Sequence, residues 1–223
     1  LQSPGKVTGG SITFEGKDVL AMSKEEMTNF RGNKVAMIFQ NPMTCLNPVY
    51  TIGNQLVEAL RAHDKSISKE DAEKRAMEMM EMVGINNVEK RMKQYPHEFS
   101  GGQRQRIGIA RTLALRPEFI VCDEPISALD VSIQAQVINL LEKLQREKGF
   151  SYLFIAHDLE MVHHISHKIG VMYLGNMVEL GSSDDVYKKP LHPYTRALIS
   201  AAPIADPKMA KEKKRIILEG EVP

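Results

Sequence analysis

Short apolar runs alternate with amphipathic stretches along most of this chain, and the spacing of the apolar residues predicts a series of strands and helices. Strands are predicted at residues 11–14, 35–39, 119–122, 151–156, 169–173 and 176–180. Helices are predicted at residues 52–63, 69–83, 102–115, 132–148 and 159–166, and a further helix is predicted at the start of residues 182–223. Turns are expected at 15–17 and 32–33, and the prolines and asparagines of residues 40–48 are typical of a loop.

The order of these elements indicates an α/β fold. Strands and helices alternate from residue 102 to residue 173, which is typical of a parallel sheet flanked by helices. Residues 41–98 form a helical insert that is rich in methionine and charged residues. Ser68 and Asp71 match a helix N-terminal capping pattern, and Gly84 is a plausible end of the same helix.

Composition narrows the classes of function. The chain has 223 residues, of which 43% are apolar, so it can bury a core. Its net charge of +1 gives no general electrostatic case for binding nucleic acid or an anionic membrane. Its apolar runs are too short to span a membrane, so any membrane role must come through a partner. The two cysteines, Cys45 and Cys122, lie far apart in sequence, which favours a reduced, cytosolic protein.

Two carboxylates follow the predicted strand at 119–122. In open parallel sheets, ligands bind at the carboxyl ends of strands, which is where Asp123 and Glu124 lie. One carboxylate could serve a Mg²⁺ shell while the other polarises a water molecule. His157 ends the next strand and could contact a phosphate or orient a water. The alternative is that these polar residues end strands merely because the strands meet solvent.

The stretch Ser100–Gln103, with sequence SGGQ, opens the helix predicted at 102–115. Its glycines would let the backbone approach an anion, and the start of a helix presents free N–H groups to such a ligand. The alternative is an ordinary N-cap with a flexible lead-in. Arg104, Arg106 and Arg111 on the same helix are better explained as surface or salt-bridge residues than as phosphate ligands.

Taken together, these motifs resemble the ATP-binding cassette (ABC) ATPases. Ser100–Gln103 resembles their signature motif, with Phe99 where leucine is commoner, and residues 119–124 resemble their Walker B strand. Residues 127–130 resemble the D-loop, His157 the switch histidine and Gln40 the Q-loop glutamine. The resemblance implies a RecA-like P-loop NTPase core, an ABC nucleotide-binding domain, with a helical signature subdomain.

The resemblance also implies roles for individual residues. Asp123 would serve the Mg²⁺ shell through water, Glu124 would be the general base, and His157 would contact the γ-phosphate. Gln40 would sense metal and water, and Asp130 would communicate across a dimer. The trans contact to ATP, in which one subunit's signature motif meets ATP held by the other, would come from Ser100, Gly101, Gly102 and Gln103.

A phosphate loop of the form G-x-x-x-x-G-K-[ST] is missing from the sequence. The family places that loop just upstream of the first residues here. We therefore expect an N-terminally truncated chain that binds ATP weakly or not at all and is inactive alone. We also expect the loss of the strand that feeds the loop to leave residues 119–122 as a sheet edge.

Three further segments resemble the ATPases of oligopeptide and dipeptide importers, with nickel importers as near matches. These segments are IFQNPMTCLNP, LHPYTRALISAAPIADP and RIILEGEVP. The implied function is ATP hydrolysis coupled to peptide uptake, with ATP and Mg²⁺ as cofactors. The implied partners are a second ATPase subunit, in a homo- or heterodimer, two transmembrane permease subunits and, indirectly, an extracytoplasmic peptide-binding protein, with no nucleic acid. The implied location is peripheral, on the cytoplasmic face of the membrane.

The resemblance divides the chain into four expected segments. Residues 1–40 are a partial N-terminal β subdomain with a core strand, and 41–116 the helical signature subdomain. Residues 117–181 are the RecA-like core with Walker B, D-loop and H-loop, and 182–223 an extension of oligopeptide-transporter type. Some relatives hold an iron–sulfur cluster through a cysteine-rich C-terminal segment. This chain has no cysteine after Cys122, so we expect no cluster.

Two alternatives to the importer stay open: a soluble ABC ATPase of translation or DNA repair, and a non-catalytic or regulatory chain that lends only its signature motif. The helix at 69–83 is crowded with methionines, which fit core packing or a contact with the membrane subunit. A histidine group around residues 160–167 has spacing that could bind a metal, but a solvated face is the simpler interpretation.

Overall fold

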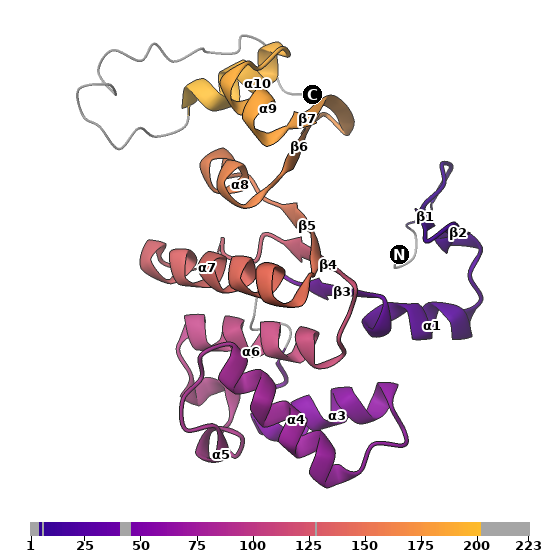
Figure 1. The fold of residues 1–223 in the computed structure, drawn as a ribbon, viewed down its shortest axis with the longest axis vertical. Coiled ribbons are helices and arrows are strands. Elements are labelled where there is room, and N and C mark those ends of the chain that lie inside the picture. Colours follow the sequence, from indigo (N-terminus) through magenta and orange to yellow (C-terminus); the bar gives the residue numbers. More distant parts are fainter. Residues whose placement is uncertain (1–4, 6, 41–45, 128, 202–223) are drawn as a thin grey trace.

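The computed structural model describes residues 5, 7–40, 46–127 and 129–201. At its centre lies a parallel sheet in the order β3-β4-β5, formed by β3 (Val35–Ile38), β4 (Phe119–Asp123) and β5 (Ser151–Ile155) (Figure 1). Two antiparallel pairs flank it: β1 (Thr13–Phe14) with β2 (Lys17–Asp18), and β6 (Lys168–Tyr173) with β7 (Asn176–Ser182). The predicted α/β class is confirmed.

The central strand is β4, which corrects the expectation that residues 119–122 form an edge. Val35 to Ile38 of β3 pair with Phe119 to Cys122 on one side, and Ser151 to Ile155 of β5 pair with Phe119 to Asp123 on the other. Ile120 and Cys122 are completely buried. Both ladders of β4 are thus filled from within the described chain, and β5 lies at the end of the described sheet.

The strand predicted near 169–173 is also placed differently from the expectation. We expected it in the parallel sheet, but β6 pairs antiparallel with β7 in a separate two-stranded sheet. A two-residue turn at Leu174–Gly175, both with positive φ, joins the two strands directly. Such a short connection forces antiparallel pairing, because a parallel partner would need a long crossover.

The helices that the structure describes are α1 (Lys24–Asn33), α3 (Ile52–His63), α4 (Lys69–Met82), α5 (Val88–Arg91), α6 (Gly101–Ala114), α7 (Val131–Lys148), α8 (Leu159–Ile165), α9 (Ser183–Lys188) and α10 (Pro193–Ala201). Among them, α3, α4, α6, α7 and α8 closely follow predicted ranges. Short 3₁₀ turns occur at η1 (Val19–Ala21) and η2 (Pro96–Glu98). Ser68 caps α4 by accepting from the Asp71 N–H, and Gly84 follows α4 with φ 77°, as the sequence indicated. The helices α1, α5 and α10 were not predicted.

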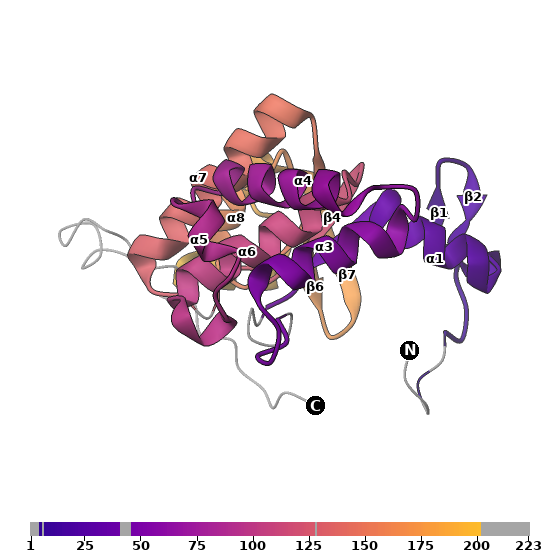
Figure 2. The same cartoon turned by 90° about the horizontal axis from the view of Figure 1, so that it is seen from below.

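One continuous core joins the helical segment to the sheet. Buried residues of α3 and α4, such as Leu56 and Met80, belong to the same cluster as Ile107 of α6, Ile120 of β4 and Leu141 of α7. In Figure 1, α3–α6 gather below the sheet and β6, β7 and α8–α10 stand above it. In Figure 2, α1 and the β1–β2 hairpin lie to one side, away from α7. A smaller cluster holds β6 against α9.

The methionines of α4 mainly serve the core. Met79 and Met80 are buried, and Met77 and Met82 pack against the same cluster from half-buried positions. Core packing is therefore confirmed for the first two, while Met77 also reaches the surface. Among the residues that the structure describes, none of the helices combines the length and the apolar character that a membrane crossing requires.

Candidate functional site

Three polar side chains meet at the carboxyl ends of the three parallel strands. Gln40 follows β3, Glu124 follows β4 and His157 follows β5. The Gln40 side-chain amide donates to Glu124 Oε2 at 2.7 Å, and His157 Nδ1 lies 3.5 Å from Glu124 Oε1. The Glu124 side chain is 29% exposed and that of His157 is 73% exposed. The parallel sheet thus gathers residues that lie 84 and 33 positions apart in the chain around one carboxylate.

The backbone of Glu124 is in an unusual conformation. Its φ is 42°, in the left-handed region that residues other than glycine rarely adopt. Its N–H donates to the Ile155 carbonyl at 2.9 Å, and its carbonyl accepts from both the N–H and the hydroxyl of Ser127. Asp123, the preceding residue, is half-buried at the end of β4. Strained backbone of this kind persists only where neighbouring bonds hold it, and it occurs preferentially at functional sites.

The expected D-loop, residues 127–130, leads into α7. Asp130 is the N-cap of α7: its carboxylate accepts from the Ile133 N–H at 3.1 Å and from the Ser132 hydroxyl at 2.8 Å. The Ser132 hydroxyl and then the Ile133 N–H hold the pKa of Asp130 below its usual value. Residue 128 of this motif lies outside the described residues. Within this structure Asp130 therefore shapes the start of a helix.

The predicted signature motif forms a separate unit at the start of α6. Ser100 and Gln103 build a capping box: the Ser100 hydroxyl accepts from the Gln103 N–H, and the Gln103 side chain accepts from the Ser100 N–H. Ser100 is therefore the N-cap of α6, while the predicted contact of this motif with an anion stays a prediction. These hydrogen bonds join Ser100 and Gln103 to each other, whereas Glu124 contacts Gln40 and His157.

The two glycines of this motif have different surroundings. A side-chain carbon on Gly102 would lie 2.5 Å from the Cγ2 methyl of Ile133 in α7, so glycine is required there for α6 to approach α7. A carbon on Gly101 would meet only Leu129, at 4.0 Å, which is an ordinary contact. At Gly102, packing against α7 already requires glycine. At Gly101 no such contact requires it, so access of a ligand to the backbone is a sufficient reason for glycine there.

Two glutamines that sequence reasoning missed hold the loop between Glu124 and Asp130. Gln105 of α6 donates to the Pro125 carbonyl, and Gln134 of α7 donates to the Ile126 and Leu129 carbonyls. Gln105 is 2% exposed. Its position three residues after buried Gly102 and four before buried Ile109 puts a polar residue on the apolar face of α6, and this pattern could have identified it.

The donor set fits a magnesium nucleotide. Carboxylate and amide oxygens of Asp123, Glu124 and Gln40 are the hard ligands that Mg²⁺ prefers, and Mg²⁺ usually takes few protein ligands plus phosphate oxygens. In the described part of the chain, no group of three or more His, Cys, Asp or Glu side chains could hold a metal without such help.

Burial raises the pKa of the Cys122 thiol to about 12, which keeps this residue protonated and unreactive.

The histidines of α8 have different partners. His163 lies 3.3 Å from Asp184 and stacks on Tyr187, both of α9, whereas His164 lies 3.3 Å from Glu142 of α7. Each imidazole therefore ties α8 to a different neighbouring helix. These contacts account for the two residues as links between helices.

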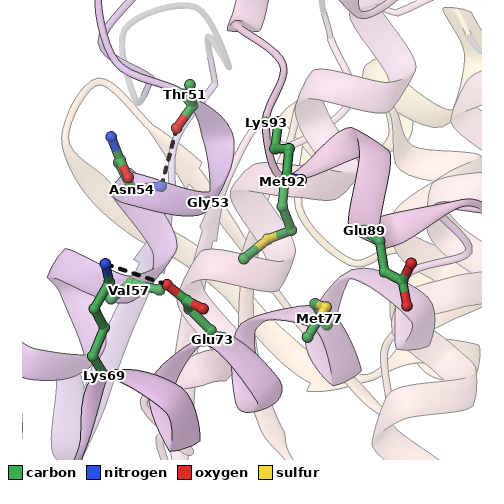
Figure 3. A pocket seen from close by; sticks show the side chains of 10 residues that line it. All are labelled: Thr51, Gly53, Asn54, Val57, Lys69, Glu73, Met77, Glu89, Met92 and Lys93. Atoms are coloured by element: carbon green, nitrogen blue, oxygen red, sulfur yellow. Dashed lines mark hydrogen bonds and ion pairs between the residues drawn. The ribbon is translucent and has the colours of Figure 1, made fainter.

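A pocket of about 550 Å³ opens between α3, α4 and α5 (Figure 3). Its apolar lining comes from Val57, Met77 and Met92. Around these lie charged residues of both signs, including Lys69 and Glu73, whose charged atoms are 3.8 Å apart. The pocket is on the helical segment, on elements other than the strands that carry Glu124.

Comparison with known proteins identifies the class of this chain. Residues 1–127 match the family described as ABC transporter, and the chain belongs to that family. Two solved cassettes have the same fold. A dimeric post-hydrolysis state of the ATP-binding cassette MJ0796 bound to ADP and Pi is 27% identical, with a TM-score of 0.69 over 79% of this chain and 74% of that one. The other, cbiO1 from Clostridium perfringens, is 22% identical, with a TM-score of 0.71 over 82% and 69%.

More particular similarities point to one group within the family. Residues 178–223 match the family described as oligopeptide/dipeptide transporter, C-terminal region. The chain is 54% identical over 218 residues to the oligopeptide transport ATP-binding protein OppF of Salmonella typhimurium, covering 98% of this chain and 64% of that protein. It is 47% identical over 213 residues to the dipeptide transport ATP-binding protein DppF of Lactococcus lactis, covering 96% and 67%. The chain thus spans about two thirds of the length of these relatives.

Proposed function

We propose that the whole protein is the ATP-hydrolysing subunit of an ABC importer that takes up oligopeptides or dipeptides. The observation that carries this proposal is the convergence of Gln40, Glu124 and His157 at the ends of three parallel strands. It provides a carboxylate, an amide and an imidazole within reach of one reacting centre. The names of the relatives support the choice of peptides as cargo.

In this proposal Glu124 accepts the proton of the attacking water. Gln40 already occupies Oε2 of the carboxylate, and this bond fixes the carboxylate plane and turns Oε1 toward His157. A water between Oε1 and the terminal phosphate of ATP would give its proton to Glu124 as it attacks. His157, whose side chain is largely exposed, would donate to the phosphate. Asp123 would hold Mg²⁺ through water, and the ion would neutralise phosphate charge.

The signature motif would contact ATP held by a second subunit. Ser100 accepts a bond in the capping box, but a hydroxyl that accepts keeps its own hydrogen to donate. Capping of α6 and a contact from Ser100 to phosphate are therefore compatible. Gly101 and Gly102 would bring the N–H groups of the first turn of α6 to the same ligand, and Gln103, whose own N–H bonds the Ser100 hydroxyl, would contribute its side-chain amide. Asp130 is assigned the contact across the dimer.

The remaining partners and boundaries are part of the same proposal. The protein would form a homo- or heterodimer on the cytoplasmic face of the membrane, bound to two permease subunits and served by a peptide-binding protein outside. The pocket of Figure 3 offers an apolar floor with mixed charges around it, which suits a short amphipathic segment of a permease. The four segments 1–40, 41–116, 117–181 and 182–223 remain the proposed units.

The test is steady-state ATP hydrolysis by the full-length gene product. Glu124→Gln should abolish most turnover while ATP binding is kept, because an amide cannot accept the proton of water. Glu118→Gln is a matched control: it makes the same change just before β4, on a surface carboxylate paired with Lys34. Equal turnover in Glu124→Gln and wild type would place the base elsewhere. Peptide uptake by vesicles that contain the permeases tests the cargo.

A further inference from the structure

The strained backbone at Glu124 needs contacts that hold it in place. On the N-terminal side, β4 is fixed by its ladders with β3 and β5. On the C-terminal side the chain leaves the sheet at Pro125, and the support there comes from side chains. Ser127 bonds the Glu124 carbonyl locally, two residues beyond that point. A link from another helix is therefore the natural anchor for the backbone that follows the carboxylate.

Gln105 supplies that link at Pro125, the residue next to Glu124, whereas Gln134 of α7 bonds the Ile126 and Leu129 carbonyls further along the loop. Its side-chain amide donates to the Pro125 carbonyl at 2.5 Å, and both residues are buried. A buried amide in a hydrogen bond resists displacement, because breaking the bond leaves both polar groups without water. Gln105 also lies on α6, whose first turn carries Gly101 and is capped by Ser100. One side chain thus connects the helix of the signature motif to the backbone adjacent to Glu124.

We propose that Gln105 is a positioning residue for the Glu124 carboxylate. By fixing the Pro125 carbonyl to α6, it holds Glu124 in the left-handed conformation that directs its side chain toward Gln40 and His157. It also carries displacements of the first turn of α6 directly to the hydrolytic carboxylate. The kinetic part of this inference rests on the proposed ATPase function, whereas the mechanical part does not.

The kinetic test is the variant Gln105→Met in the full-length gene product. Methionine keeps the length and burial of the side chain but removes the donor. A misplaced carboxylate should lower kcat by about ten- to a hundredfold. The KM for ATP should stay within about twofold, because the base does not bind the nucleotide. In Gln105→Asn the side chain is too short to reach Pro125, so this variant should show the same fall in kcat. It replaces Gln105→Met in the test if that variant folds poorly.

The matched control is Gln55→Met. Gln55 is also a buried glutamine, and it donates to the Asn47 and Tyr50 carbonyls in the helical segment. Because Gln55 also accepts from the Asn47 N–H, this variant should lose at least as much stability as Gln105→Met, and it should keep the kcat of the wild type. A kcat in Gln105→Met within about twofold of wild type, or an equal loss in Gln55→Met, overturns the positioning role.

Hydrogen exchange separates this inference from the proposed function. The Ser127 and Leu129 N–H groups bond the Glu124 and Ile126 carbonyls within the loop that Gln105 anchors. In Gln105→Met these two amides should exchange faster, while the amides of α6 stay as protected as in wild type. If the wild type hydrolyses no ATP, the proposed function fails, and hydrogen exchange alone then decides whether Gln105 anchors the loop. Unchanged protection at Ser127 and Leu129 overturns the inference.

Discussion

Replacing Gly102 with alanine should destabilise the fold, although alanine is normally the better helix former. The added carbon would lie 2.5 Å from the Cγ2 methyl of Ile133 and 3.5 Å from two more of its carbons. Gly102 is buried near the start of α6, and Ile133 lies in the first turn of α7. The two helices can therefore keep their spacing only if the Ile133 side chain moves or α6 shifts.

The change in the free energy of unfolding caused by Gly102→Ala is the difference between two opposing effects. Overpacking a buried contact costs about 1–3 kcal/mol. The change from glycine to alanine inside a helix returns up to about 1 kcal/mol. The expected net loss is roughly 1–2 kcal/mol, which for a domain of this size lowers Tm by about 2–8 °C. Gly101→Ala has the same chemistry without the clash, since its carbon would meet only Leu129 at 4.0 Å.

Thermal and urea unfolding of Gly101→Ala, Gly102→Ala and the double variant Gly102→Ala/Ile133→Ala measure these effects. Gly101→Ala should be at least as stable as wild type, because it gains helix propensity without a clash. Truncating Ile133 should suppress the destabilisation caused by Gly102→Ala, so that the two substitutions are strongly coupled. A Gly102→Ala protein as stable as Gly101→Ala would refute the reasoning, because α6 and α7 would then not be in the contact that requires glycine.

Three other predictions concern single side chains. Gln40→Ala should lower kcat while nucleotide binding is retained, because Glu124 loses the donor to Oε2; steady-state kinetics and a binding titration check this. Cys122 should resist alkylation at pH 8 until the protein is denatured, as peptide mapping would show. Because burial raises the pKa of its thiol from 9.0 to about 12, its contribution to stability is full below pH 9.0 and is lost as the pH rises toward about 12. Asp130, whose pKa is lowered mainly by the Ser132 hydroxyl, should contribute stability above its ordinary value of 3.8 that is lost as pH falls below it; Asp130→Asn should keep the cap and lose this pH dependence in urea titrations.

Local signals in the sequence account for the success with most helices and strands. The helix at 52–63 was predicted with the observed bounds because its apolar period is strong, and Ser68 marked the start of the next one. The helix α1 was missed because it is mostly polar and only Gly32 is buried. A local sign was present even there, since Ser23 and Glu26 form a capping box.

The candidate site was predictable only in part. The rule that parallel strands end at a common edge predicted that Glu124 and His157 lie close together, and the family resemblance added Gln40 to this site. The left-handed backbone at Glu124 was not predictable, because it depends on bonds to Ile155 and the following loop. Nor was the anchor from Gln105, which lies 20 residues before Pro125 and reaches it only after α6 has packed on the sheet.

Strand order was the main structural error, and its correction bears on the chemistry. The apolar character of residues 119–122 shows that the strand is buried, but it cannot show which strands lie beside it. In the structure β4 is paired on both sides, whereas β5 ends the described sheet and leaves Leu153 and Ile155 50% and 45% exposed. In the described sheet, β5 is thus an exposed apolar edge. Glu124 therefore extends from a strand that is paired on both sides, and His157 from a strand that is paired on one side only. This difference suits the proposed chemistry, because the imidazole must follow the phosphate of an arriving nucleotide while the carboxylate that takes the proton stays in place.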